Sequence, residues 1–195
     1  METIEAFSER FSGKAKTILT QMIPEYQERY RDYVHETENP ATQSRRIKYL
    51  TKCFLRLLEQ PYFYIQPLAK KRAQEATCWQ YPANYPLCDE EELSHLLSTT
   101  DGQSFEVIYN GAFVGLCHFD VTCDELVLRF ALRPDRLGQG LGEGFYQAIE
   151  SYATEHYKTK RLCILTSASL LQTFMEKQGY QKNGGNTKLM KTLRD

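Results

Sequence analysis

The sequence predicts an α/β (α+β) fold in which helices flank a mixed, mostly antiparallel sheet, with a helical extension before it. Two observations support this prediction. Residues 1–60 carry apolar side chains at helical spacing, and strand and helix patterns then follow in the order β-α-α-β-β-β-α-β-α-β-β. Hairpin-linked strands followed by β-α-β-α require both antiparallel and parallel pairing. We therefore expect a helical extension at 1–60 and an α/β domain at 61–195.

The extension should contain more than one helix. Gly13 and Pro24 interrupt an apolar stripe that runs through residues 4–33, so the first helix is expected to be kinked or split. Asn39 is a suitable cap, and Pro40 a suitable first residue, for a further helix. The side chains expected to point inward from that helix are Ile47, Leu50, Phe54, Leu57 and Leu58.

The other side of this further helix is basic, with Arg45, Lys48, Lys52 and Arg56. These side chains could contact a phosphate or an acidic partner, although a solvated helix face has the same pattern. Residues 1–60 hold ten basic and nine acidic side chains, so the extension as a whole is not a basic module.

Turn signals separate the elements expected after residue 61. A short strand at 62–66 is followed by helical spacing at 69–79 and, after an aromatic loop, again from Asp89. Two strands meet at Asn110 and Gly111, a dipeptide that suits a two-residue hairpin turn. The remaining elements are expected in this order: a strand at 125–133, a helix at 145–157, a strand at 161–166, a helix at 167–178 and two strands divided by Gly184 and Gly185.

The composition argues against several classes of partner. Lys and Arg number 24 and Asp and Glu number 25, so the net charge is -1 and no overall field attracts nucleic acid or an anionic membrane. No apolar run approaches the roughly 20 residues of a membrane helix. The first residues lack the basic start and apolar stretch of a signal peptide. We expect a cytoplasmic protein without nucleic-acid or membrane partners.

The six cysteines form no Cys-x-x-Cys pair, and the four histidines are scattered along the chain. We therefore expect reduced thiols that pack as small apolar groups, and no metal site.

A glycine-rich turn carries the clearest chemical signal. Gly138, Gly140 and Gly142 alternate with other residues between an expected strand and an expected helix. Without Cβ atoms, N–H groups can approach a ligand closely, and the start of a helix attracts anions. The spacing fits neither the GxGxxG dinucleotide fingerprint nor the GxxxxGK[ST] nucleotide loop. The turn is therefore predicted to cradle another diphosphate, or to be a strand-to-helix turn without a ligand.

Across about residues 61–195 the sequence resembles the GNAT superfamily of N-acetyltransferases. The coenzyme A loop of that family reads Arg/Gln-x-x-Gly-x-Gly/Ala, and Gly140 and Gly142 match its two small positions. Leu137 stands where Arg or Gln is usual, and Arg136 lies one place earlier. The resemblance implies a GNAT-like sheet, acetyl-CoA (coenzyme A) as the cofactor and an amine as the acceptor.

A bacterial subgroup of the family is similar in two further places. Its Trp-x-Tyr…Tyr loop corresponds to Trp79, Tyr81 and Tyr85, and its Leu-Arg-Pro-Asp…Gly-x-Gly-Leu-Gly run corresponds to residues 132–142. The resemblance implies that the three aromatic residues form one lip of the substrate site. We also expect Arg129, which lies in an otherwise apolar strand, to bind an acidic group of the substrate or to pair with Glu106.

The resemblance also implies contacts with coenzyme A. The pantetheine would pair with Phe130, Ala131, Leu132 and Arg133, and the N–H of Ala131 or Leu132 would polarise the thioester carbonyl. The diphosphate would lie on the loop formed by Leu137, Gly138, Gln139, Gly140, Leu141, Gly142 and Glu143.

Two departures from the family pattern affect the catalytic residues. Met175 occupies the position of the usual Tyr that protonates the thiolate, and Ala168 occupies the position of a frequent Asn. Tyr180 and Tyr146 are nearby phenols, which could replace the acid or could be core aromatics. His118 is the candidate base because it titrates near neutral pH, although it could instead be a partly buried strand residue.

Two carboxylates, Asp120 and Glu106, are further candidates for the base and are expected to be solvated.

We therefore predict an N-acetyltransferase that moves acetyl from acetyl-CoA to an amine of a small molecule or peptide by direct attack. The alternative is a catalytically weak or inactive coenzyme A-binding protein with a regulatory or interaction role. Residues 1–60 could pack on the domain, bind a partner or form a homodimer.

Overall fold

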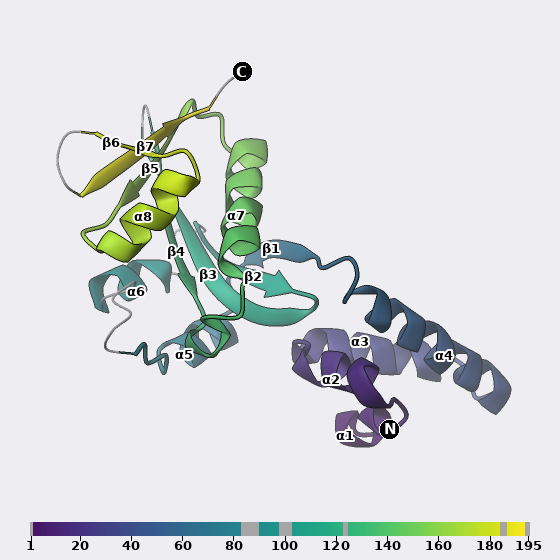
Figure 1. Cartoon of the computed structure of the whole chain (residues 1–195). Helices are drawn as coiled ribbons and strands as arrows, with labels where there is room; N and C mark the ends of the chain where they lie inside the picture. The colour runs from purple at the N-terminus through teal and green to yellow at the C-terminus, as the bar shows by residue number, and fades with distance from the viewer. Residues whose placement is uncertain (1, 83–89, 98–102, 123–124, 184–186, 194–195) are drawn as a thin grey trace. The chain divides into compact units, whose positions relative to one another are not determined.

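The computed structural model describes residues 2–82, 90–97, 103–122, 125–183 and 187–193 (Figure 1). The chain divides into two compact units. The first unit comprises Met1–Tyr64 with Ile108–Phe113, and the second comprises Ile65–Val107 with Val114–Asp195.

The first unit is helical, as predicted. Its helices are α1 (Ile4–Ser8), α2 (Gly13–Gln21), α3 (Pro24–His35) and α4 (Pro40–Arg56). The first apolar stripe is split rather than kinked. Gly13 has a φ of +54° at the start of α2, and Pro24 begins α3, where its missing N–H costs nothing. Asn39 caps α4 as predicted, because its Oδ1 accepts hydrogen bonds from the N–H groups of Ala41 and Thr42 at 2.9 and 3.3 Å.

The apolar sides of these helices form the core of the first unit. Phe7 and Phe11 meet edge to face at 5.3 Å, and Phe11 lies 5.5 Å from Phe54 of α4. The inward position predicted for Leu58 is wrong, since this side chain is 50 % exposed. Its helical spacing no longer applies there, because α4 ends at Arg56.

The predicted hairpin turn at Asn110 and Gly111 is confirmed, and it belongs to the first unit. Both residues have positive φ, +50° and +86°, as a two-residue hairpin turn requires. The Asn110 side chain accepts from the N–H of Tyr62 at 2.9 Å and donates to the carbonyl of Leu57 at 3.2 Å. The carbonyl of Gly111 accepts from the N–H of Ile23 at 2.8 Å.

The strands form a mixed sheet in the order β1-β2-β3-β4-β5-β7-β6. Strand and helix elements follow one another along the chain as predicted, with one additional 3-10 turn. They are β1 (Phe63–Pro67), α5 (Lys70–Ala76), α6 (Glu90–Leu96), β2 (Ser104–Tyr109), β3 (Ala112–Val121), β4 (Leu126–Leu132), the 3-10 turn η1 (Pro134–Arg136), α7 (Gly142–His156), β5 (Arg161–Leu165), α8 (Ser169–Lys177), β6 (Gln181–Lys182) and β7 (Lys188–Thr192).

The parallel pair β4–β5 holds together at one end only. It pairs Leu126 with Leu162 and Val127 with Cys163, whereas β3 pairs with β4 from Val121–Leu126 to Gly115–Leu132. Beyond Val127 the strands β4 and β5 therefore part, and among the described strands the second half of β4 pairs with β3 alone.

Helix α7 packs closely on the sheet next to this opening. Phe145 of α7 lies 6.2 Å from Phe130 of β4, and Tyr152 stacks on Phe119 of β3 at 5.6 Å. A Cβ at Gly115 of β3 would come within 2.5 Å of the Phe145 ring and 2.6 Å of the Ala131 carbonyl. A glycine at position 115 thus lets the first turns of α7 sit against the sheet.

No described helix is both long enough and apolar enough to span a membrane.

Candidate functional site

A pocket of about 170 Å³ opens in the second unit where β4 and β5 part. It is lined by Tyr81, Phe130, Ala131, Leu132, Leu137, Gly142, Phe145, Leu170, Leu171 and Phe174. Phe130 and Ala131 are neighbours in a strand, so their side chains point to opposite faces of the sheet. Because both line the pocket, it follows the edge of β4 from one face to the other. Of the described residues that line it, Tyr81 alone has a polar side chain.

The backbone of β4 turns polar groups toward this opening. The N–H of Arg133 donates to the carbonyl of Val114 on β3 at 2.8 Å. Since antiparallel ladders alternate, the N–H of Ala131 is directed to β3 as well, whereas those of Phe130 and Leu132 face the side from which β5 has parted. The carbonyl of Leu132 accepts a 2.8 Å hydrogen bond from the Tyr81 hydroxyl.

The glycine-rich turn meets the pocket at Leu137 and Gly142. Gly138 and Gly140 have φ values of +71° and +75°, so the conformation itself favours glycine. Gly142 does not have a positive φ, and a Cβ there would meet no atom within 4 Å. Neither conformation nor packing within the chain requires a glycine at position 142.

The first turn of α7 leaves backbone donors for a ligand. Its N-cap residue, Leu141, makes no side-chain cap hydrogen bond. The first N–H groups of a helix have no partner within it and attract anions. Glu143 lies in this turn with an exposed side chain that accepts from Gln147 at 3.3 Å. A bound anion would therefore meet the backbone N–H groups of residues 142–144, with the Glu143 carboxylate directed elsewhere.

Two arginines lie just before the glycine turn. Arg133 forms ion pairs of 2.9 Å with both Glu75 and Asp135. The buried Nε of Arg136 has no hydrogen-bond partner among the described residues and lies 3.9 Å from an Asp135 oxygen. The Gln139 side chain folds back to donate to the Asp135 carbonyl at 2.6 Å.

His118 lies in a hydrogen-bonded chain on β3 rather than in the pocket. Its side chain is 3 % exposed, with Nδ1 2.8 Å from Ser104 Oγ and Nε2 3.0 Å from Asp120 Oδ1. A carboxylate only accepts, so Nε2 carries a proton and donates it to Asp120. The Ser104 hydroxyl, which pairs with Nδ1, also lies 3.4 Å from the carbonyl of His95. Arg129 Nε donates to the other Asp120 oxygen at 3.0 Å. Arg129 therefore shares its carboxylate partner with His118.

The two acidic candidates for the base differ in their surroundings. Asp120 is partly exposed: burial acts to raise its pKa, but hydrogen bonds from Arg129 and His118 outweigh burial and hold the pKa below its usual range. The solvated position expected for Glu106 is wrong, because this residue is 1 % exposed. Its carboxylate accepts from the Gln66 side chain and from the N–H of Ala69 at 3.3 Å.

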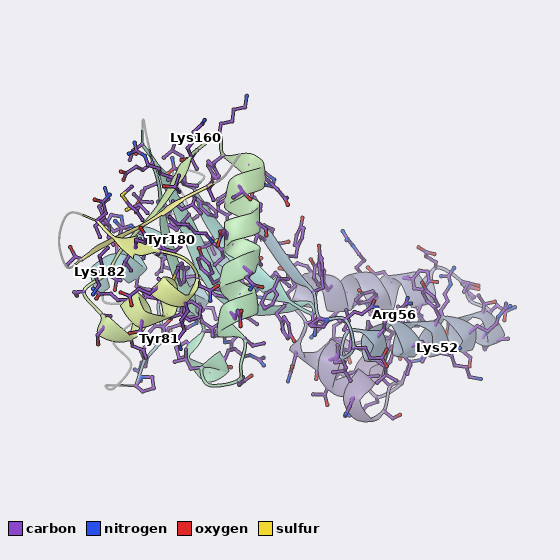
Figure 2. All side chains as sticks on the ribbon, turned by 45° about the horizontal axis from the view of Figure 1, so that its top comes forward. Lys52, Arg56, Tyr81, Lys160, Tyr180 and Lys182 are labelled. Carbon is purple, nitrogen blue, oxygen red and sulfur yellow. The ribbon has the colours of Figure 1, made fainter. Side chains whose placement is uncertain are left out.

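Tyr180 lies in the core, apart from Tyr81 (Figure 2). It is 2 % exposed, and its hydroxyl accepts a 2.9 Å hydrogen bond from Tyr146, which is fully buried. Burial raises the pKa of both phenols. Neither lines the pocket, and Met175 on α8 is also fully buried.

The three aromatic residues predicted for the substrate lip have separate positions. Tyr81 lines the pocket. Trp79 follows α5 and does not line the pocket. Its backbone N–H donates to the carbonyl of Ala76 at 3.0 Å. Tyr85 lies outside the described residues.

Four lining residues were not predicted as site residues: Phe145, Leu170, Leu171 and Phe174. The last three come from α8, where residues 170, 171 and 174 share one side of the helix. The helical spacing of these three apolar residues was the one signal in the sequence that could have indicated a pocket wall. The same spacing is also typical of a helix that packs on a core.

By sequence alone, no protein-family model and no curated protein matches the chain. Solved structures with a similar fold include N-acetyltransferases. A chimera of the spermidine N-acetyltransferase SpeG from Vibrio cholerae and hSSAT aligns with a TM-score of 0.51 and 11 % identity, covering 67 % of this chain and 95 % of that one.

Two further solved structures contain the coenzyme. The aminoglycoside acetyltransferase AAC(6')-Ib, in complex with coenzyme A, gives a TM-score of 0.51, 12 % identity, and coverage of 67 % of this chain and 95 % of that one. The Campylobacter jejuni N-acetyltransferase PseH, in complex with acetyl coenzyme A, gives a TM-score of 0.51, 15 % identity, and coverage of 68 % and 100 %.

The structure thus has a mixed sheet, parted between two parallel strands and flanked by helices, of the kind found in acetyltransferases. This fold is the GNAT fold, and the predicted fold class is confirmed.

Proposed function

We propose that the chain is an acetyl-CoA-dependent N-acetyltransferase that acts by direct attack of an amine from a small molecule or peptide. The observation that supports this most strongly is a juxtaposition. One pocket contains both the free edge of β4 and the glycine-rich start of α7. The similar solved structures are acetyltransferases, and two of them contain coenzyme A or its acetyl form.

The residues around the glycine turn fit a diphosphate. The N–H groups at the start of α7 would donate to it, and a glycine at position 142 leaves room where a Cβ would stand. Arg136 would supply a positive charge, and its buried Nε lacks a hydrogen-bond partner among the described residues. We propose that residues 137–143 hold the diphosphate through their backbone.

The free edge of β4 fits the pantetheine and the thioester. Acetyl-CoA would supply the activated acetyl group when bound, and coenzyme A would leave as the thiolate. Of the two N–H groups predicted to polarise the carbonyl, the ladder directs that of Leu132 into the opening and that of Ala131 to β3. We therefore propose Leu132 N–H as the donor. Phe130, Leu171 and Phe174 provide apolar walls that exclude water.

The positions of His118 and Tyr180 favour indirect roles. Both ring nitrogens of His118 already have partners, so direct removal of a proton from the acceptor would require Ser104 or Asp120 to move. Tyr180 would have to break its bond with Tyr146. We propose that His118 positions Asp120 and Arg129 beside β4. A coenzyme A thiolate, with a pKa of about 8.5 like other free thiols, can leave without a dedicated acid.

The alternative function is coenzyme A binding without turnover. It is favoured by the buried Met175 in place of an acid and by the pocket lining, where Tyr81 is the one side chain able to give a proton. Both functions require coenzyme A in the same pocket.

Calorimetric titration with coenzyme A, followed by thiol release from acetyl-CoA with a panel of amines, separates the functions. Saturable binding with amine-dependent thiol release supports the transferase. Binding without release above the hydrolysis background supports the alternative. Absence of coenzyme A binding would overturn both.

A further inference from the structure

A row of four cations runs along the outer side of α4 in the first unit. Arg45, Lys48, Lys52 and Arg56 are spaced by three, four and four residues, so they share one side of the helix. All four side chains are exposed. Figure 2 labels Lys52 and Arg56 on this helix. We call these four residues the α4 basic row.

The basic row is not neutralised within the described part of the chain. Helix α4 contains no Asp or Glu, and no member of the row forms an ion pair with a carboxylate of the described residues. Arg45 donates to the neutral hydroxyl of Thr42 at 3.1 Å. By contrast, Arg46 lies off the row and pairs with Glu36 at 3.0 Å. Like charges at this spacing repel one another, so the row reduces the stability of the isolated helix.

Two large apolar side chains border the row. Tyr49 is 60 % exposed and Leu55 is 41 % exposed. At 3.6 residues per turn they fall on opposite edges of the row. The packing side of α4 is elsewhere, since Leu50 and Phe54 enter the core of the first unit. Much of the Tyr49 and Leu55 side chains therefore remains exposed beside the row.

We infer that the outer side of α4 binds an acidic helix of a protein partner. Carboxylates spaced three and four residues apart on such a helix would match the four cations, and apolar residues beside them would cover Tyr49 and Leu55. Arginine and tyrosine are enriched in protein interfaces for these reasons.

Nucleic acid fits the row less well than an acidic helix. The whole chain has a net charge of -1, so a long polyanion would gain little from its overall field. The apolar borders would also gain nothing from a phosphate backbone. The inference is independent of the coenzyme A proposal, because α4 contributes no residue to the pocket.

The test uses the full chain and a fluorescent synthetic peptide. The peptide is an alanine-based helix with four Glu residues spaced by four, four and three positions, the α4 spacing in reverse, and with Leu on both sides of the Glu row. A second peptide has Gln in place of each Glu. Binding is followed by anisotropy. Lys48→Glu/Lys52→Glu is compared with Lys14→Glu/Lys177→Glu, which makes the same charge change at two other exposed lysines.

We expect the Glu peptide to bind the unaltered chain and the control variant equally, and the basic-row variant about tenfold or more weakly. The Gln peptide should bind all three weakly. Equal binding of the Glu peptide to both variants, or no binding to the unaltered chain at about 1 mM, would overturn the inference. So would a single-stranded RNA that binds through the row when the Glu peptide does not. Equal thermal unfolding of the two variants shows that the fold is retained.

Discussion

The hydroxyl of Tyr81 donates a 2.8 Å hydrogen bond to the carbonyl of Leu132, the last residue of β4. This bond crosses from the segment after α5 to the free half of β4, and both residues line the pocket. Tyr81 thus fixes the end of the strand whose Leu132 N–H is proposed to face the thioester.

Replacing Tyr81 with Phe removes this hydrogen bond and keeps the ring. We expect coenzyme A binding to weaken a few-fold and the free energy of unfolding to fall by about 0.5–1.5 kcal/mol. Calorimetry and thermal unfolding measure the two effects. Tyr64→Phe removes a hydroxyl from a 43 % exposed tyrosine of the first unit and should change neither quantity. Unchanged coenzyme affinity in Tyr81→Phe would contradict a role for this bond in the site.

Gly142→Ala and Gly142→Leu should separate stability from coenzyme A binding. A Cβ at this helical position meets no described atom within 4 Å, so alanine should stabilise the unliganded chain by up to about 1 kcal/mol. The coenzyme A loop pattern that Gly142 matches also allows Ala, so Gly142→Ala should keep its coenzyme A affinity. The larger side chain of Gly142→Leu would stand where the diphosphate is proposed to lie, and coenzyme A should bind this variant about tenfold or more weakly. Melting temperature and calorimetry provide the two measurements.

The matched control for this substitution is Gly13→Ala, at another first helical position with open space but with a φ of +54°. It should lower stability and leave coenzyme A affinity unchanged. If Gly142→Leu binds coenzyme A as tightly as the unaltered chain, the diphosphate does not lie on this turn.

Gly115→Ala should destabilise the second unit by overpacking. The new Cβ would approach the Phe145 ring and the Ala131 carbonyl at 2.5 and 2.6 Å, and neither is the end of a flexible chain. We expect a loss of about 1–3 kcal/mol in the free energy of unfolding, measured by chemical denaturation. A stability equal to that of the unaltered chain would mean that α7 does not depend on this close approach.

Asp120 should make stability depend on pH in the acid range. Its pKa is lower in the folded chain than in the unfolded one, so the charged carboxylate stabilises the fold. That contribution is complete above the unfolded pKa of about 3.9 and is lost as the pH falls through the folded value. The difference in unfolding free energy between the unaltered chain and Asp120→Asn should therefore shrink between about pH 5 and about pH 3. A constant difference across this range would contradict the assignment.

His118→Ala should lower acetyl transfer and stability together. Buried Ser104 would lose its hydrogen bond with His118, and of the two side chains that donate to Asp120 only Arg129 would remain. We expect the free energy of unfolding to fall by about 1–3 kcal/mol. A positioning role predicts a lower kcat/KM with the same shape of pH profile. A role as base predicts that the profile between about pH 6 and about pH 8 loses its dependence on a histidine. An unchanged kcat/KM across this range in the folded variant would remove His118 from the reaction.

Local signals in the sequence were sufficient for much of the fold. Asn39 and Pro40 start α4, and Asn110 and Gly111 turn the β2–β3 hairpin, because each feature depends on residues that are adjacent in the chain. The parting of β4 from β5 could not be read in this way. It depends on the pairing of two strands that a whole helix separates in the chain. It also depends on where this pairing stops, which is at Val127 and Cys163.

The site was predictable only in its backbone part. The strand ending at Leu132 and the turn containing Gly142 are consecutive in sequence, and both meet the pocket. The surroundings of His118 were predictable only in part, since Asp120 lies two residues away on the same strand but Ser104 reaches the other ring nitrogen from β2. Nothing in the local sequence distinguishes an accessible strand histidine from one already paired.

The most direct test of the account is the electron density of coenzyme A in crystals of the full chain. We predict the diphosphate on the N–H groups of residues 137–143 and the pantetheine along residues 130–132, with the sulfur near Leu132 N–H. Density for coenzyme A elsewhere on the chain, or a pocket that stays free of it at saturating concentration, would contradict the proposed function.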